Sequence, residues 1–328
     1  MATAHTTVDS AGFSRVRGWL RRLRSGDEIA RLLTLLFALS VVLFTLLLVQ
    51  RLWDESGQAR QAFGWTFLVS RVWDPVAAQF GALPFIYGTL LTSLLGLIVA
   101  VPLGLGAAIF LAELAPRRIS DGLTFLIDLL AAVPSVIYGL LGVFVVVPLM
   151  RTVIQPALKQ TLGFLPLFQG PAYGIGFLTG GVVLAVMIVP FIISVSREVL
   201  LAVPVDQREA ALALGATRWE ATWKAVMPYA RAGLLGSVFL ALARALGETM
   251  AVTMVIGNNP NISASLFAPG YSIAAVLANE FSEATGDLYL SALIELALVL
   301  FVLTFILNGL ARLLIALTAK RGSGMAHV

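Results

Sequence analysis

Two charged residues, Arg244 and Glu248, stand four positions apart in the uncharged surroundings of residues 234–256. In one continuous helix they would share a face, because residues four apart are neighbours on a helix surface. The planar guanidinium of arginine is well suited to binding oxyanions. Charges in so apolar a stretch usually face a bundle interior or a water-filled path. We interpret the pair as part of such a path; the alternative is a neutralising pair that serves packing alone.

Other reactive residue types are scarce. The chain has no cysteine, and its two histidines, His5 and His327, lie at the extreme ends. This composition excludes disulfides and cysteine nucleophiles and argues against hydrolytic zinc chemistry. No G-x-x-x-x-G-K-[ST] pattern occurs either, so we expect that the chain cannot hydrolyse ATP alone. Asp128 and Glu295 also interrupt apolar stretches, and the sequence assigns them no role.

A second group of residues lies in the polar segment 204–228. Asp206 and Glu209 have the spacing of a capping box, which predicts a short helix from about Gln207. Gly215 is the expected left-handed end of that helix. Ala210 and Ala211 are small enough to let another surface approach closely. The helix is therefore either a docking element or an amphipathic helix resting on a membrane.

A further helix is expected directly after Gly215. Thr217 and Glu220 form a second capping box, and Pro228 is the expected breaker that ends the helix near Met227. The segment 204–228 is thus predicted to be two short helices joined by a sharp turn, and not a slack linker.

The overall composition indicates a membrane protein. Of 328 residues, 59% are hydrophobic and only 12% are charged, and the mean hydropathy is +0.93. A membrane-spanning helix needs about 20 largely apolar residues. Stretches of this kind predict six spans, at about residues 32–50, 88–112, 123–150, 174–196, 234–256 and 289–315. The third would hold Asp128 near one end.

The net charge of +4 and the pI of about 9.7 have a simple explanation in such a protein. Basic residues concentrate in cytoplasmic loops, so they need not indicate nucleic acid. Most of the 22 lysines and arginines lie before the first span, between spans two and three, between spans four and five, and after the sixth. This bias predicts a multi-pass protein of the cell inner (plasma) membrane with both termini in the cytoplasm.

The same bias sets the expected organisation. Residues 1–28 form a cytoplasmic N-terminal tail, and 29–83 hold the first transmembrane helix plus an extracytoplasmic segment. Residues 84–316 form the main transmembrane domain with the loop 204–228, and 317–328 form a cytoplasmic C-terminal tail. The first span has no small-residue cleavage site after it, so we expect a retained anchor, not a signal peptide.

The loop 204–228 resembles the "EAA" loop of ABC importer permeases. Glu209, Ala210, Ala211, Gly215 and Pro228 stand at the family's spacing, while Ala225 and Met227 replace the usual Ile and Leu. The resemblance implies an all-α membrane protein whose six transmembrane helices form a type I ABC importer permease (MetI-like) bundle. It also implies a coupling helix that docks on a separate ATPase subunit, where Glu209 makes polar contacts and Gly215 permits the turn.

Within that family the chain resembles the permeases of phosphate importers. The resemblance lies in residues 243–252 (ARALGETMAV), 131–140 (AAVPSVIYGL), 265–269 (SLFAP) and 277–281 (LANEF), and it covers about residues 80–315. It implies phosphate translocation past Arg244 and Glu248, without a cofactor in this chain. The implied partners are a second permease subunit in a heterodimer, a cytoplasmic ATPase dimer, an extracytoplasmic phosphate-binding protein and membrane lipid, and no nucleic acid.

Three alternatives remain open. The same scaffold could carry another oxyanion or a small solute, since one arginine does not discriminate among them. An ion-coupled secondary carrier could use Arg244, Glu248 and Glu295 as a relay, but it would need no docking loop. An intramembrane enzyme would need a nucleophile with a base at depth, for which the chain offers no histidine or cysteine.

Overall fold

The computed structural model describes residues 27–323, which are helical apart from their connecting loops. Residues 1–26 of the predicted N-terminal tail and the last residues of the predicted C-terminal tail lie outside this range. By contacts the chain divides into two compact units, Met1–Glu55 and Ser56–Val328. Six helices in the described part are long and apolar enough to cross a membrane, as the sequence predicted.

The described part of the first unit is one helix, α2 (Asp27–Glu55). It carries no charge between Arg31 and Arg51 and is apolar on every side, as expected of a membrane span. Its 29 residues correspond to about 43 Å of helix, which is more than the hydrocarbon core of a bilayer requires. The predicted first span is therefore confirmed as a continuous helix.

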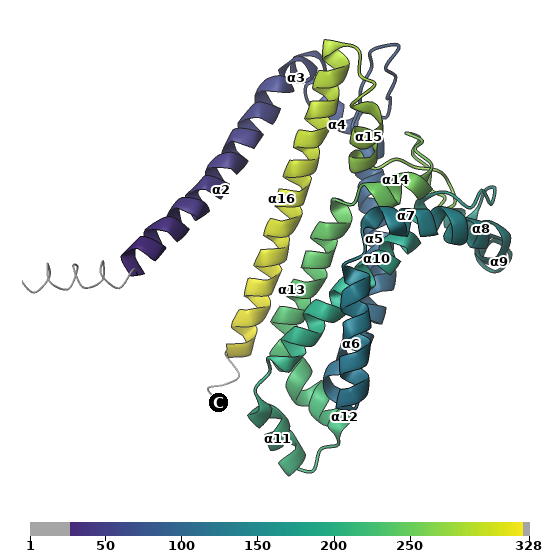
Figure 1. Ribbon diagram of the computed structural model, residues 1–328. Coiled ribbons are helices and arrows are strands. Elements are labelled where there is room, and N and C mark those ends of the chain that lie inside the picture. Colours follow the sequence, from purple (N-terminus) through teal and green to yellow (C-terminus); the bar gives the residue numbers. More distant parts are fainter. Residues whose placement is uncertain (1–26, 324–328) are drawn as a thin grey trace, which may run out of the picture. The chain divides into compact units, whose positions relative to one another are not determined.

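The second unit contains all the remaining helices (Figure 1). They are α3 (Gly57–Phe63), α4 (Thr66–Val69), α5 (Leu83–Ile109), η1 (Phe110–Leu114), α6 (Arg117–Ala131), α7 (Ser135–Leu141), η2 (Gly142–Val146), α8 (Val147–Leu149), η3 (Met150–Ile154), α9 (Gln155–Leu162), η4 (Pro166–Phe168), α10 (Phe177–Leu201), α11 (Val205–Ala213), α12 (Arg218–Ala221), η5 (Thr222–Val226), α13 (Met227–Leu246), α14 (Met250–Ile256), α15 (Ile273–Glu280) and α16 (Asp287–Ser323). We call its two extremes the α11 end and the α15 end.

Helices α5 and α10 pack along each other and form the centre of the unit. Their close contact requires glycine at two positions. A Cβ on Gly104 would lie 2.6 Å from Ile192 Cγ2, and one on Gly181 would lie 2.6 Å from Leu95 Cβ. Small residues of this kind let membrane helices approach closely. The buried side chains of α10 then pack against α14 as well as α5.

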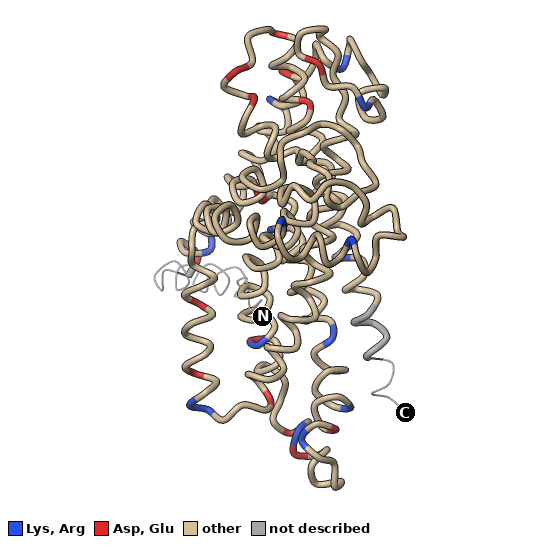
Figure 2. The backbone as a smooth tube through the Cα atoms, turned by 90° about the vertical axis from the view of Figure 1, so that its right-hand side faces the viewer, with Lys and Arg blue, Asp and Glu red and all other residues tan. Residues whose placement is uncertain are grey.

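Each end of the unit has its own apolar cluster. At the α15 end, α3, α4, α5, α15 and α16 bury a cluster rich in aromatic rings, including Phe67, Phe80 and Phe85. At the α11 end, smaller side chains from α5, η1, α10, η5 and α13 form a second cluster, which includes Leu111, Leu200 and Val226. Charged residues appear at both ends of the tube in Figure 2.

The structure corrects the third predicted span. Residues 123–150 are not one helix, because α6 ends at Ala131 and α7 begins at Ser135. Pro134 explains the break: its backbone is extended (φ −57°, ψ 140°), and a proline disfavours helical geometry at the residue before it. The segment long and apolar enough to span is Ser135–Leu162, which runs across the direction of α6 in Figure 1.

Candidate functional site

The fifth predicted span is also broken, and the break falls between the two residues predicted to share its face. Helix α13 ends at Leu246 with Gly247 as its C-cap, and α14 begins only at Met250. Arg244 therefore lies in the last turn of α13, while Glu248 lies in the non-helical connection. The expectation of one continuous helix face was wrong, because hydropathy does not reveal a break inside an apolar run.

Arg244 is exposed and lies against an aromatic ring of α10. Its guanidinium carbon is 5.6 Å from the centroid of the Phe191 ring. A cation over a ring face gains about 0.5–2 kcal/mol, more where water is excluded.

Glu248 has a local structural contact. Its Oε1 accepts a hydrogen bond from the backbone N–H of Ala251 at 3.1 Å, in the first turn of α14. A carboxylate is stabilised at a helix N-terminus, where N–H groups lack partners inside the helix. No ion pair joins Arg244 to Glu248 in the part of the chain that the structure describes. Arg244 thus lies just before the break and Glu248 within it, and they do not neutralise each other directly.

A further polar pair lies one turn along α10 from Phe191. Ser194 donates a hydrogen bond from its Oγ to Asp128 Oδ1 of α6 at 2.9 Å. Phe191 and Ser194 are three residues apart and so lie on the same face of α10. Asp128 is exposed. Asp128, to which sequence analysis assigned no role, thus bonds to α10 one turn from the ring that contacts Arg244.

The first helix of the loop 204–228 starts earlier than predicted. Helix α11 follows Pro204 directly, and Asp206 makes no side-chain cap bond. Because the proline ring already fixes φ at the helix entry, Asp206 falls inside the first turn, where its charge favours the helix dipole. The predicted end is confirmed: Gly215 has φ +85°, and Ala216 N–H donates to Ala211 O at 3.2 Å across the turn.

The second capping box is confirmed, but the predicted helix end is not. Thr217 N–H donates to Glu220 Oε2 at 2.9 Å, and Glu220 N–H donates to Thr217 Oγ1 at 3.3 Å. The helix then runs through the π turn η5 into α13 without stopping at Pro228. Widening to the π turn lets the helix pass a residue that has no N–H to donate.

The four residues predicted to dock on another subunit lie on the outside of this loop. Glu209, Ala210 and Gly215 are exposed and Ala211 is half-buried. None of the residues of α11 is buried, and Leu214 beyond its end is 91% exposed. The loop is thus a projecting surface at the α11 end that exposes apolar, acidic and basic side chains.

Sequence reasoning missed the residue that attaches α11 to the bundle. Arg208 Nη2 donates to Glu113 Oε1 of η1 at 2.7 Å, and Arg208 Nε donates to Glu113 Oε2 at 3.1 Å. The same guanidinium donates to Val203 O at 2.6 Å and to Leu200 O at 2.7 Å. The only local signal was an acid at the end of an apolar stretch, because the two partners are 95 residues apart.

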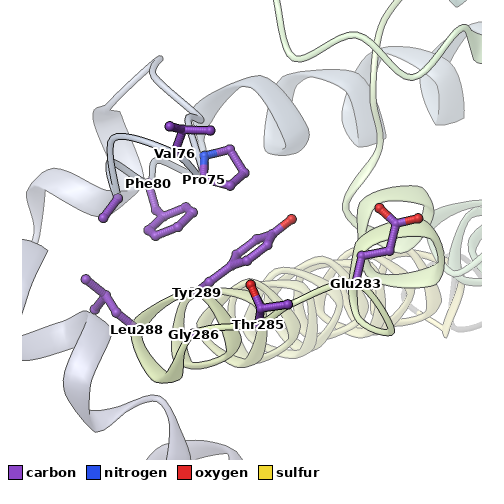
Figure 3. A pocket seen from close by; sticks show the side chains of 9 residues that line it. Pro75, Val76, Phe80, Glu283, Thr285, Gly286, Leu288 and Tyr289 are labelled. Carbon is purple, nitrogen blue, oxygen red and sulfur yellow. The ribbon is translucent and has the colours of Figure 1, made fainter.

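A pocket of about 530 Å³ lies at the α15 end, away from all these residues. Figure 3 shows Phe80 and Tyr289 in its wall, and their rings are stacked with centroids 5.2 Å apart. Glu280 Oε2 behind them accepts hydrogen bonds from Trp73 Nε1 at 2.8 Å and Tyr289 OH at 2.7 Å. Nearby, burial raises the pKa of Tyr271 to about 12, so this hydroxyl stays protonated.

Comparison with known proteins identifies the family. Residues 100–320 match the family described as "Binding-protein-dependent transport system inner membrane component". A "Phosphate transport system permease protein PstC" from Mesorhizobium japonicum is 47% identical over 93% of this chain and 94% of its own. The Haemophilus influenzae protein of the same name is 47% identical over 88% and 93%, respectively.

A more distant relative and a solved structure extend the comparison. A "Probable phosphate transport system permease protein PstC" from Methanocaldococcus jannaschii is 35% identical over 87% of this chain and 92% of its own. An inward-facing MetNI methionine ABC transporter aligns with a TM-score of 0.49 at 16% identity, over 73% of this chain and 94% of that one. From the family match and the curated relatives, the chain belongs to the family of inner membrane components of binding-protein-dependent transport systems.

Proposed function

We propose that this chain is the membrane-spanning permease subunit of an ABC importer that brings inorganic phosphate into the cell. The family supports the importer class, and the names of relatives at 47% identity over most of their length support the substrate. The chain is a transport subunit that needs no cofactor of its own, and ATP is hydrolysed by a separate ATPase subunit.

The observation that carries the proposal is the helix break at 247–249 beside Arg244. Non-helical backbone at membrane depth is tolerated only where protein covers it or where it lines a water-filled cavity. Gly247 in the break and Arg244 before it are both exposed in this chain. An exposed arginine beside an exposed break, in an otherwise apolar segment, fits a water-lined path for an anion. Arg244 gives the anion a transient contact, and Glu248 holds the start of α14.

The α11 end faces the cytoplasm in this proposal, and both termini lie on that side. Glu209, Ala210, Ala211 and Gly215 dock on an ATPase dimer, and a second permease subunit completes the path as a heterodimer. An extracytoplasmic phosphate-binding protein delivers the substrate at the α15 end. ATP-driven closure of the ATPase dimer then moves α11 and switches access to the path. The exposed surface of α11 and the left-handed Gly215 support this arrangement.

The test is uptake of radiolabelled phosphate at low external concentration in cells that lack this gene. The cells are complemented with the wild type, Arg244→Gln, Glu209→Ala or the control Arg151→Gln, which removes an exposed arginine of η3. Wild type and control restore uptake. Arg244→Gln lowers it by about tenfold or more with the complex still assembled, the size expected when a hydrogen bond to a charged group is lost. Glu209→Ala weakens ATPase co-purification.

Two results would contradict the proposal at different levels. If deletion leaves phosphate uptake intact but lowers uptake of another oxyanion, the importer class stands and the substrate is wrong. If no oxyanion is affected and no ATPase co-purifies with the chain, the importer assignment itself is wrong, and an ion-coupled carrier becomes the better explanation.

A further inference from the structure

Arg208 is the point at which the exposed helix α11 meets the ends of two other helices. Its guanidinium contacts Glu113 at the end of η1, the carbonyl group of Leu200 at the end of α10 and that of Val203 just beyond it. We propose that Arg208 and Glu113 are a positioning pair that transmits movement of α11 to α5 and α10. The inference rests on the proposed function, because it concerns how ATPase movement reaches the path.

The geometry of the contact suits a mechanical link. The Arg208 side chain is 21% exposed and that of Glu113 only 8%, so water screens the pair weakly. Two parallel N–H···O bonds to one carboxylate fix orientation as well as distance. The guanidinium also gives the Leu200 carbonyl a second donor beside the N–H of Val203, and it donates to the Val203 carbonyl just beyond α10. Removing either side chain therefore leaves buried charge or buried polar groups uncompensated.

Packing does not provide an equivalent attachment for α11. No residue of this helix is buried, although it contacts η5. Its covalent connections run to α10 through 202–204 and to α12 through the turn at Gly215. The second connection leads along η5 and α13 to Arg244. Without the Arg208 contact, displacement of α11 would pass to α13 more directly than to α5.

The pair thus makes α10 and α13, the two walls of the proposed path, move together. Helix α13 carries Arg244 at its far end, while α10 carries Phe191 and Ser194. Helices α5, α10 and α13 meet in the apolar cluster beside Arg208, which includes Leu111, Leu200 and Val226. When α11 is displaced, the guanidinium moves the ends of η1 and α10 together with the start of α13. A lysine offers a point charge on a flexible stem and lacks the fork needed to hold the carboxylate and both carbonyl groups.

The experiment measures phosphate transported per ATP hydrolysed by the whole complex in proteoliposomes, with inorganic phosphate and the binding protein present. Arg208→Met keeps the apolar stem and removes every hydrogen bond of the guanidinium. It is expected to lower phosphate per ATP by about tenfold or more, while ATPase co-purification is retained. Glu113→Gln is also expected to lower phosphate per ATP, and Arg208→Lys is expected to keep part of the wild-type ratio. The control Glu198→Gln changes a carboxylate that is 69% exposed at the same end of α10, and it leaves the ratio unchanged.

A second measurement does not depend on the substrate. Because the chain contains no cysteine, spin labels can be placed at Leu214→Cys and Glu198→Cys, both on exposed side chains. With Arg208 present, the distance distribution between the labels is narrow and unchanged by ATP. With Arg208→Met it broadens and responds to ATP.

Either of two results overturns the inference. One is a wild-type label distribution that Arg208→Met leaves unchanged. The other is a parallel loss of transport, hydrolysis and bound ATPase, which would show a role in assembly only. If the wild-type complex moves no phosphate, the proposed substrate fails, and the label distances still decide whether Arg208 links α11 to α10.

Discussion

The two ends of the second unit are stabilised in different ways. The α15 end buries large aromatic side chains, and Glu280 is held there by both Trp73 and Tyr289. The α11 end projects a helix with no buried residue, attached through the fork of Arg208. Elements with few buried contacts open and move at low free-energy cost, whereas densely packed clusters do not. The difference indicates a rigid α15 end and a movable α11 end.

The largest expected effect tests the rigid end. Phe85 is fully buried, with ring centroids 4.8 Å from Trp73 and 5.5 Å from Tyr271. Phe85→Ala removes this ring and leaves a cavity, which costs about 3–5 kcal/mol. We expect a clear fall in the melting temperature of the purified complex, with phosphate per ATP unchanged in the fraction that remains folded. Phe305→Ala, at a ring that is 72% exposed, is the control. An equal loss in the control would contradict the comparison.

Local signals allowed part of this structure to be predicted from the sequence. The number of spans follows from hydropathy, and the turn at Gly215 and the Thr217–Glu220 capping box follow from residues close in the chain. The breaks at Pro134 and Gly247 lie inside apolar runs, and hydropathy alone predicts a continuous span across each of them. They were missed although both residues are known to disrupt helices.

Non-local contacts could not be predicted in this way. Arg208 and Glu113 are 95 residues apart, and the sequence around either residue does not predict contact with the other. Arg244 and Glu248 were found by residue type, but their assignment to one helix face assumed a continuous helix. The structure instead places Arg244 in the last turn of α13 and Glu248 within the break. Residue chemistry thus predicted which side chains to examine, while their mutual geometry depended on the folded backbone.

An intermediate effect tests the movable end. Gly215 has φ +85°, and a Cβ there would meet no atom within 4 Å, so any cost of Gly215→Ala comes from the backbone alone. Placing an L-residue in this conformation costs about 1–2 kcal/mol. The expected result is weaker ATPase co-purification with the melting temperature of the permease little changed. Gly286→Ala, at another open position without a positive φ, is the matched control. A fall in melting temperature as large as that of Phe85→Ala would show that the two ends are not separable.

The smallest effect distinguishes the two kinds of ion pair at the α11 end. Lys224 and Glu220 are 3.6 Å apart and four residues apart on one helix, with side chains 77% and 44% exposed. Water and salt screen such a pair, so Lys224→Met should change the free energy of unfolding by no more than about 0.5 kcal/mol. The measurement is the melting temperature and phosphate per ATP of this variant beside Arg208→Met, at low and at high salt. Both variants replace a cation of an ion pair by the same apolar side chain, so they change the net charge at the loop equally. If Lys224→Met uncoupled the complex as strongly as Arg208→Met, net charge on the loop would explain coupling, and the buried fork of Arg208 would not be needed.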